Sequence, residues 1–166
     1  QFILAQSLND DFSDGNLQDP TYLGDTDDFV VQNEQLRLMA PAAGSSFLFL
    51  PVQTDASQTV IYELFAQLEF SPSSSNFAEL RFAGLGPSGE AVSYALKIGG
   101  ISGDQDALVF SATVDGTEQT LISGTAGAVG QDTARARIRL VRSATNNWTL
   151  LADYSGGDNF SNEGSS

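Results

Sequence analysis

Regular alternation of apolar and polar side chains narrows the folds open to this sequence more than any other feature. Residues 60–70 read VIYELFAQLEF, with Tyr62 and Leu64 on one face and Glu63 and Gln67 on the other. Because successive side chains of a strand point to opposite faces, this pattern predicts a half-buried strand of an antiparallel sheet. Further strand-like runs, separated by Gly, Ser, Pro, Asn and Asp, lie at residues 36–39, 46–52, 77–83, 92–98, 107–114, 120–122, 134–142 and 148–154. Nine short strands and no long amphipathic helix predict an all-β sandwich.

The same alternation predicts the core. Trp148 is in phase with Leu150 and Ala152, so we expect its side chain to be buried. Besides the apolar face of 60–70, the expected core residues are Leu80, Phe82, Tyr94, Leu96, Ile98, Ile138 and Leu140. If these strands are neighbours, their other face is charged, and it is either a solvated surface with cross-strand ion pairs or a platform for a ligand. That charged set is Glu69, Glu79, Arg81, Lys97, Arg137 and Arg139.

Composition excludes several kinds of chemistry. The 166 residues include no His and no Cys, which rules out Ser-His-Asp and Cys-His catalysis and zinc sites built on imidazole or sulfur. Asp and Glu number 21 against 7 Lys and Arg, a formal net charge of −14. Such a chain lacks the clustered cations that bind nucleic acid or anionic lipid. Positively charged partners and hard divalent cations remain compatible with it.

The N-terminal residues bear on localisation. Residues 1–7 (QFILAQS) are interpreted either as the remnant of a signal peptide or as an N-terminal extension, and residues 8–166 as a single domain. No run approaches the roughly 20 apolar residues of a membrane-spanning helix, so we expect no membrane insertion. A secreted or cell-surface location is expected, since a chain without Cys is compatible with export from bacteria.

Four segments resemble a known kind of module. Residues 137–154 (RIRLVRSATNNWTLLADY) resemble a hairpin of laminin-G-like, concanavalin A-like jelly rolls. Residues 9–16, 70–77 and 156–164 are similar to the N-terminal module of large secreted surface proteins of Bacteroidetes-type bacteria. The resemblance implies a two-sheet antiparallel jelly-roll β-sandwich. It also implies closing strands beyond the GGDNFSNEG stretch, so we expect the domain to lack its closing C-terminal strand or to be completed by further sequence.

Aspartates crowd the N-terminal third. Asp10, Asp11 and Asp14 lie in the loop NDDFSDGN, and carboxylate and backbone oxygens are the ligands that Ca²⁺ prefers. The spacing is not that of an EF-hand. The alternative is that these aspartates cap turns and keep the protein soluble. The resemblance implies a structural calcium ion, with Asp10 or Asp11 as one contributor.

Paired catalytic carboxylates are not apparent. Glu63 and Glu69 share a face, but six residues at about 3.3 Å each separate them by roughly 20 Å, whereas glycoside hydrolysis needs about 5 to 9.5 Å. Glu79 has no acidic neighbour in the sequence. We therefore expect a protein that is not an enzyme, with a glycoside hydrolase as the least favoured function.

Binding is the favoured function. Tyr22, in the polar loop 19–28, is the aromatic residue most expected to be exposed, and Phe77 follows a Ser-rich turn. The predicted function is recognition of an extracellular glycan or adhesion within a larger surface protein. The alternative is a structural or assembly role, with contacts to another protein domain or copy through an open sheet edge and the Arg-bearing strand 134–142. The candidate ligand-binding residues are Tyr22, Phe77, Glu79, Arg81, Arg137 and Arg139.

Overall fold

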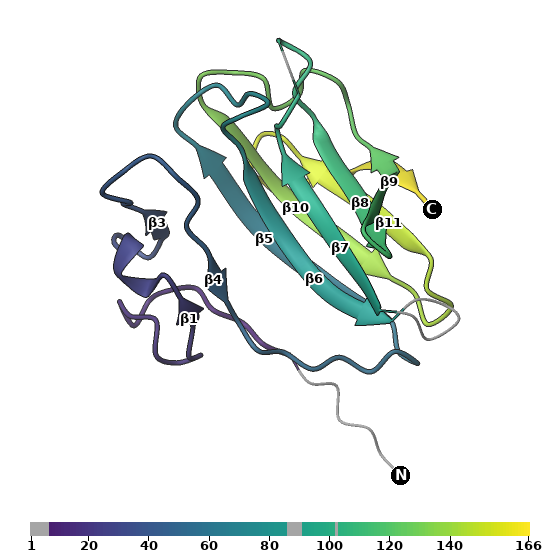
Figure 1. The fold of residues 1–166 in the computed structure, drawn as a ribbon, viewed down its shortest axis with the longest axis horizontal. Coiled ribbons are helices and arrows are strands. Elements are labelled where there is room, and N and C mark those ends of the chain that lie inside the picture. The colour runs from purple at the N-terminus through teal and green to yellow at the C-terminus, as the bar shows by residue number, and fades with distance from the viewer. Residues whose placement is uncertain (1–6, 86–90, 102) are drawn as a thin grey trace. The chain divides into compact units, whose positions relative to one another are not determined.

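The chain folds into two compact units, Gln1–Gln53 and Thr54–Ser166, which are described separately. Figure 1 shows a computed structural model that describes residues 7–85, 91–101 and 103–166. The sequence-based assignment of residues 1–7 falls outside these ranges, apart from Ser7. The sequence predicts a single domain over residues 8–166, whereas the structure divides the chain after Gln53.

Strands make up nearly all of the regular structure. The described ranges contain no α-helix and one short 3-10 helix, η1 (Thr26–Asp28). The predicted all-β class is therefore confirmed. No helix in the described part of the chain is long and apolar enough to cross a membrane.

The N-terminal unit is built from two small antiparallel pairs. β1 (Leu23–Gly24) pairs with β4 (Leu48–Phe49), and β2 (Phe29–Val31) pairs with β3 (Leu36–Leu38). The strand predicted at 46–52 is much shorter than expected, and β1 and β2 were not predicted. None of the described residues up to Gln53 is buried. Turns and side-chain hydrogen bonds, rather than a closed apolar core, therefore shape this unit.

The second unit contains two four-stranded antiparallel sheets, which Figure 1 shows as two layers. The first sheet has the order β12-β11-β10-β5, formed by β5 (Val60–Leu68), β10 (Ala134–Arg142), β11 (Trp148–Asp153) and β12 (Ser161–Ser165). The second has the order β6-β7-β8-β9, formed by β6 (Ala78–Leu85), β7 (Ala91–Ile98), β8 (Leu108–Val114) and β9 (Thr117–Ser123). The predicted two-sheet sandwich is present, with seven of its eight strands at the expected positions.

The first sheet contains one pairing between strands that are far apart in the sequence. β6 to β9 follow one another as a meander, whereas β5 pairs with β10 across the whole meander, from Val60 opposite Arg142 to Leu68 opposite Ala134. One nested pair of this kind is present among the described strands. A jelly roll contains several nested pairs, so the jelly-roll topology stays a prediction.

An aromatic cluster fills the space between the sheets. Trp148 is 3% exposed, and its ring lies 4.9 Å from that of Tyr94 and 4.8 Å from that of Phe110, measured between centroids. Tyr62 and Phe82 complete the cluster. The predicted burial of Trp148 is confirmed, and the core residues expected from alternation, except Phe70, line this interior as buried or partly buried side chains.

The strand β12 was not predicted. Its sequence SNEGS has no apolar side chain, so alternation gives no signal there. Gly164 has φ of +151°, and a Cβ at that position would lie 2.8 Å from Cγ2 of Ile122 in β9. The edge of the first sheet thus approaches the edge of the second closely at this point. A residue with a side chain at 164 would push the two edges apart.

Candidate functional site

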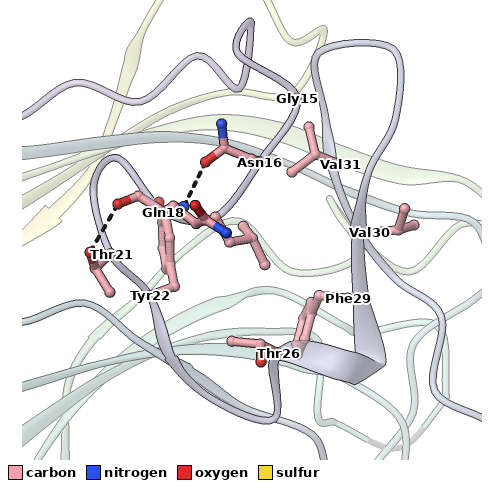
Figure 2. A pocket seen from close by; sticks show the side chains of 10 residues that line it. Gly15, Asn16, Gln18, Thr21, Tyr22, Thr26, Phe29, Val30 and Val31 are labelled. Carbon is pink, nitrogen blue, oxygen red and sulfur yellow. Dashed lines mark hydrogen bonds between the residues drawn. The ribbon is translucent and has the colours of Figure 1, made fainter.

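A cleft of about 420 Å³ in the N-terminal unit contains Tyr22, the aromatic residue that the sequence placed first among ligand contacts. Figure 2 shows Asn16, Gln18 and Tyr22 around the upper part of the cleft, with Thr26 and Phe29 below them. The side chains offer amides, hydroxyls and aromatic rings. This combination suits a ligand that has both apolar faces and many hydroxyl groups.

Short-range hydrogen bonds hold the upper wall of the cleft. Oδ1 of Asn16 accepts the N–H of Gln18 at 2.7 Å, and Oγ1 of Thr21 donates to the Gln18 carbonyl at 2.9 Å (Figure 2). The Tyr22 N–H donates to the Leu17 carbonyl at 3.0 Å. Polar residues bonded to neighbouring backbone groups favour such tight turns. The shape of this wall therefore depends on hydrogen bonds between residues close together in the sequence, and no long strand is needed.

Tyr22 is half-buried, and its ring lies 6.2 Å from that of Phe12. Burial of the phenol raises the pKa of Tyr22, and the hydrogen bond and negative charge of Asp10 raise it further. The hydroxyl is therefore protonated throughout the physiological range. The expectation that Tyr22 is the most exposed aromatic residue is wrong, since Tyr22 is partly buried whereas Phe47 is 62% and Phe49 is 56% exposed.

The three aspartates proposed as calcium ligands lie in successive turns. Oδ1 of Asp10 accepts the Phe12 N–H at 2.8 Å, Oδ1 of Asp11 accepts the Ser13 N–H at 3.0 Å, and Oδ1 of Asp14 accepts the Asn16 N–H at 3.1 Å. Each carboxylate caps its own turn, as the alternative interpretation proposes. No group of three or more acidic side chains with the arrangement of a metal site occurs in residues 7–85, 91–101 and 103–166. Calcium binding at this loop stays a prediction.

Arg137 and Arg139 lie on the outer face of the first sheet and share one carboxylate. Glu63 in β5 accepts from Nε of Arg137 at 2.9 Å through Oε1 and from Nε of Arg139 at 2.8 Å through Oε2. A second nitrogen of each guanidinium lies within 2.8 Å of the same oxygen. The hydrogen bonds and charge of Arg139, and then of Arg137, hold the pKa of Glu63 below its ordinary value although partial burial opposes them.

A loop between β11 and β12 completes this arrangement. Asp158 lies 3.0 Å from Nη1 of Arg137, and the guanidinium of Arg139 lies 4.2 Å from the centroid of the Phe160 ring. Two arginines thus face two carboxylates and one aromatic ring. Their charges are matched locally, so the face is polar and well ordered rather than strongly cationic. We call Glu63, Arg137, Arg139, Asp158 and Phe160 the arginine cluster.

Asp153 organises that loop. Oδ1 of Asp153 accepts from the Ser155 N–H at 2.8 Å and hydroxyl at 2.6 Å, and Oδ2 accepts the Asn159 N–H at 2.9 Å. These hydrogen bonds, those of Ser155 first, lower the pKa of Asp153. The carboxylate is buried but fully hydrogen-bonded. It therefore supports the loop that carries Asp158 and Phe160.

The remaining candidates lie on the second sheet. Glu79 in β6 is ion-paired with Arg81, and Nζ of Lys97 in β7 lies 3.9 Å from Oε2 of Glu79. Lys97 also lies 4.8 Å from the centroid of the Phe77 ring. Most of the Arg81 side chain is exposed. Phe77, Glu79 and Arg81 therefore do come together, as a small cluster that includes Lys97.

The expected grouping of the charged residues is wrong. The charged residues of β6, β7 and β10 do not form one face, because β10 belongs to a different sheet from β6 and β7. Arg137 and Arg139 of β10 pair with Glu63 in β5. Arg142 lies on the core-facing side of the strand and donates to the carbonyls of Asp55 and Ala56 at 3.0 and 3.3 Å.

The six candidate residues thus occupy three places: the Tyr22 cleft, the β6–β7 cluster and the arginine cluster. The sequence did not predict Asn16, Gln18, Glu63 or Asp158 as neighbours of these candidates. Asn16 and Gln18 had a signal, since Asn and Gln next to Gly and Asp mark turns that can frame a ligand. Glu63 had none, because its pairing depends on the register between β5 and β10.

Comparison of the chain with protein-family models, with characterised proteins and with solved structures found no significant match.

Proposed function

We propose that this protein is a non-catalytic extracellular binding module that recognises a glycan through the Tyr22 cleft. The observation that carries the proposal is the gathering of one tyrosine, two side-chain amides and two threonines around a single cleft (Figure 2). Its volume of about 420 Å³ falls within the range of small-molecule sites, roughly 300–1,000 Å³. Location outside the cell and membership of a larger surface protein belong to the same proposal and rest on the sequence resemblance.

Each group has a chemical task in this proposal. The Tyr22 ring packs against the C–H face of a sugar, and its hydroxyl, which donates to Asp10, can accept a hydrogen bond from a sugar hydroxyl. The amides of Asn16 and Gln18 both donate and accept, which matches sugar hydroxyls that do the same. Phe29 and Val31 supply the apolar part of the wall. Water released from these surfaces adds to the affinity.

Binding without catalysis agrees with how the nearby acids are used. Asp10 and Asp14 each use a carboxylate oxygen to accept a backbone N–H in the turns of the loop. Asp28 accepts a hydrogen bond from the Ser46 hydroxyl at 2.5 Å. A glycosidase needs two carboxyl groups facing one bond, with one of them protonated. The cleft is lined by amides, hydroxyls and apolar groups instead.

A glycan array followed by calorimetry tests the proposal. Tyr22→Ala should lower affinity for the best glycan at least tenfold, because stacking and a hydrogen bond are both lost, and Tyr22→Phe should lose less. Phe77→Ala is the matched control, an exposed aromatic residue in the other unit. If the array finds no glycan, or if Phe77→Ala and not Tyr22→Ala abolishes binding, the cleft is not the site.

An assembly role is a second candidate, favoured by β5. This strand is at the edge of its sheet and exposes Ile61 and Phe65, at 59% and 48%, beside the arginine cluster. Exposed edge strands with apolar side chains promote pairing between chains. Sedimentation at increasing concentration tests this role. Association that Phe65→Ser abolishes would support it, and a monomer at every concentration would contradict it.

A further inference from the structure

We propose that a second cleft, in the unit Thr54–Ser166, binds a small uncharged molecule that has an apolar ring and a hydrogen-bond acceptor. Aromatic ketones and amides belong to this class. The cleft is separate from the one around Tyr22, and its ligand goes beyond the glycan proposed there. Two observations support it: the residues that line the cleft, and one buried donor among them that lacks a partner.

This second cleft has a volume of about 280 Å³ and lies between the two sheets at one end of the sandwich. Val92 is the second residue of β7, Val114 is the last of β8, and Trp148 is the first of β11. Val92, Tyr94 and Trp148 are at most 6% exposed, so the floor of the cleft is part of the core. The volume is close to the lower end of the roughly 300–1,000 Å³ of small-molecule sites, which suits a ligand with a single ring.

A small side chain leaves this space open. Ala112 in β8 lies in register between Tyr94 of β7 and Gln119 of β9, and all three line the cleft. Phe110, two residues earlier on the same strand face, is completely buried and packs against the rings of Tyr94 and Trp148. The methyl group of Ala112 fills much less space than the Phe110 ring does. The interior at this end of the sandwich therefore has room for a ring supplied by a ligand.

The indole of Trp148 indicates that the ligand has an acceptor. Its Nε1 is buried and has no hydrogen-bond partner among the residues that the structure describes. A buried indole N–H ordinarily has a partner, and leaving such a donor unpaired costs free energy. Because Trp148 lines the cleft, a carbonyl oxygen of a bound molecule is suited to supply the missing acceptor.

The polar part of the lining favours an uncharged ligand. Within the described part of the chain, this part consists of Gln119, Asn146, Asn147 and Ser166, whose side chains are all neutral. A carboxylate or ammonium group would lose water in the cleft without gaining an opposite charge from the lining. Gln119 and Asn147 are exposed, so their amides can bond a neutral polar substituent at the mouth of the cleft.

Nuclear magnetic resonance of the full chain tests the inference. Trp148 is the only tryptophan, so its indole N–H gives a single signal. The probes are acetophenone, ethylbenzene, which has nearly the same shape without an acceptor, and benzoate, which carries a charge. Acetophenone should shift the indole signal until the site is saturated. Ethylbenzene should bind roughly twofold to tenfold more weakly, because one hydrogen bond is lost, and benzoate should leave the signal unchanged.

Two enlarged side chains locate the binding. Val114→Phe, at a partly buried position of the cleft wall, should weaken acetophenone binding about tenfold or more, because the new ring takes up the space. Ile61→Phe, on the exposed face of the first sheet, should not change it. Urea unfolding checks that both variants fold, and Gln119→Phe, at an exposed position of the same lining, replaces Val114→Phe if that variant does not.

Three results would overturn the inference. The first is an indole signal that acetophenone does not move. The second is acetophenone binding that a folded cleft-filling variant leaves unchanged, which would place the probe elsewhere. The third is ethylbenzene binding as tightly as acetophenone, which would show that Nε1 of Trp148 takes no part. None of these results bears on glycan binding at Tyr22.

Discussion

The carboxylate of Glu163 in β12 accepts the backbone N–H of Thr125 at 2.7 Å, which ties the last strand of one sheet to the loop that follows β9 of the other. The Ser161 hydroxyl donates to the second oxygen at 3.2 Å. Gly124 lies against the same carboxylate. One side chain thus closes a side of the sandwich that has few apolar residues to hold it.

Replacing Glu163 should loosen that side. We expect Glu163→Ala to lower the free energy of unfolding by about 1–2 kcal/mol, because the Thr125 N–H loses a charged acceptor. Hydrogen exchange should then be fastest in β12. Glu163→Gln keeps an amide oxygen and should cost less. Equal exchange in β12 of the wild type and Glu163→Ala would contradict this prediction.

Stability should fall in acid. Burial opposes ionisation of Glu163, but hydrogen bonds from Thr125, Tyr154 and Ser161 outweigh it and lower its pKa, as those from Ser155 and Asn159 lower the pKa of Asp153. The unfolded chain therefore binds more protons than the folded one in acid. This contribution is complete above the ordinary carboxyl pKa of about 4 and is lost as the pH falls through the lower folded values. Urea unfolding between pH 7 and pH 2 measures it, and Glu163→Gln should flatten the profile.

Two isoleucines on opposite faces of the first sheet test the assignment of faces. Ile138 is completely buried and Ile61 is 59% exposed. Ile138→Ala should cost about 2–5 kcal/mol through lost burial and a cavity, and Ile61→Ala should cost well under half of that. Chemical denaturation followed by the fluorescence of Trp148 measures both. Similar losses in the two variants would mean that Ile61 is covered in solution.

Arg139 should not be replaceable by lysine. It binds Glu63 through two nitrogens and lies over the Phe160 ring. Lysine supplies a single point charge in place of the planar fork. We expect Arg139→Lys to cost about 0.5–1 kcal/mol, with Arg135→Lys, at an exposed position of the same strand, close to neutral. Thermal unfolding of both variants checks this, and equal midpoints would contradict it.

Calcium removal tests the metal prediction for Asp10, Asp11 and Asp14. If this loop holds calcium, EGTA should lower the midpoint of thermal unfolding, since a ligand that binds only the folded state stabilises it. Asp11→Asn should reduce the effect. An unchanged midpoint with EGTA would remove calcium from the account and leave the turn-capping role seen in the structure.

The sequence predicted those parts of the fold that depend on short-range patterns. Alternation identified β5, β10 and the burial of Trp148, because apolar side chains of one face must share a core. Alternation did not predict β12, because this strand has no apolar side chains and forms by backbone pairing with the edge of β11. It also missed the partner of Arg137 and Arg139, because nothing local determines which strand lies beside β10.

The candidate site shows the same division. Tyr22 was identified because an aromatic residue in a polar loop is expected to be exposed, whereas the cleft around it depends on successive turns through Asn16 and Gln18. Each of those hydrogen bonds joins residues close together in the sequence, but the shape of the cleft depends on all of them together and could not be predicted from any one turn. The expected grouping of Glu79, Arg81, Arg137 and Arg139 on one face was wrong for a different reason, since sheet membership depends on the topology of the whole chain.

The pairing of β5 with β10 has a consequence for how the protein is made. Leu68 leaves the ribosome 66 residues before its partner Ala134. At about 5–20 residues per second the strand waits for roughly 3–13 seconds. The meander β6 to β9 can close during that time, since each of its strands pairs with the next. Until β10 emerges, β5 presents both Ile61 and its unpaired backbone edge, and a nascent chain in this state is an expected client of chaperones.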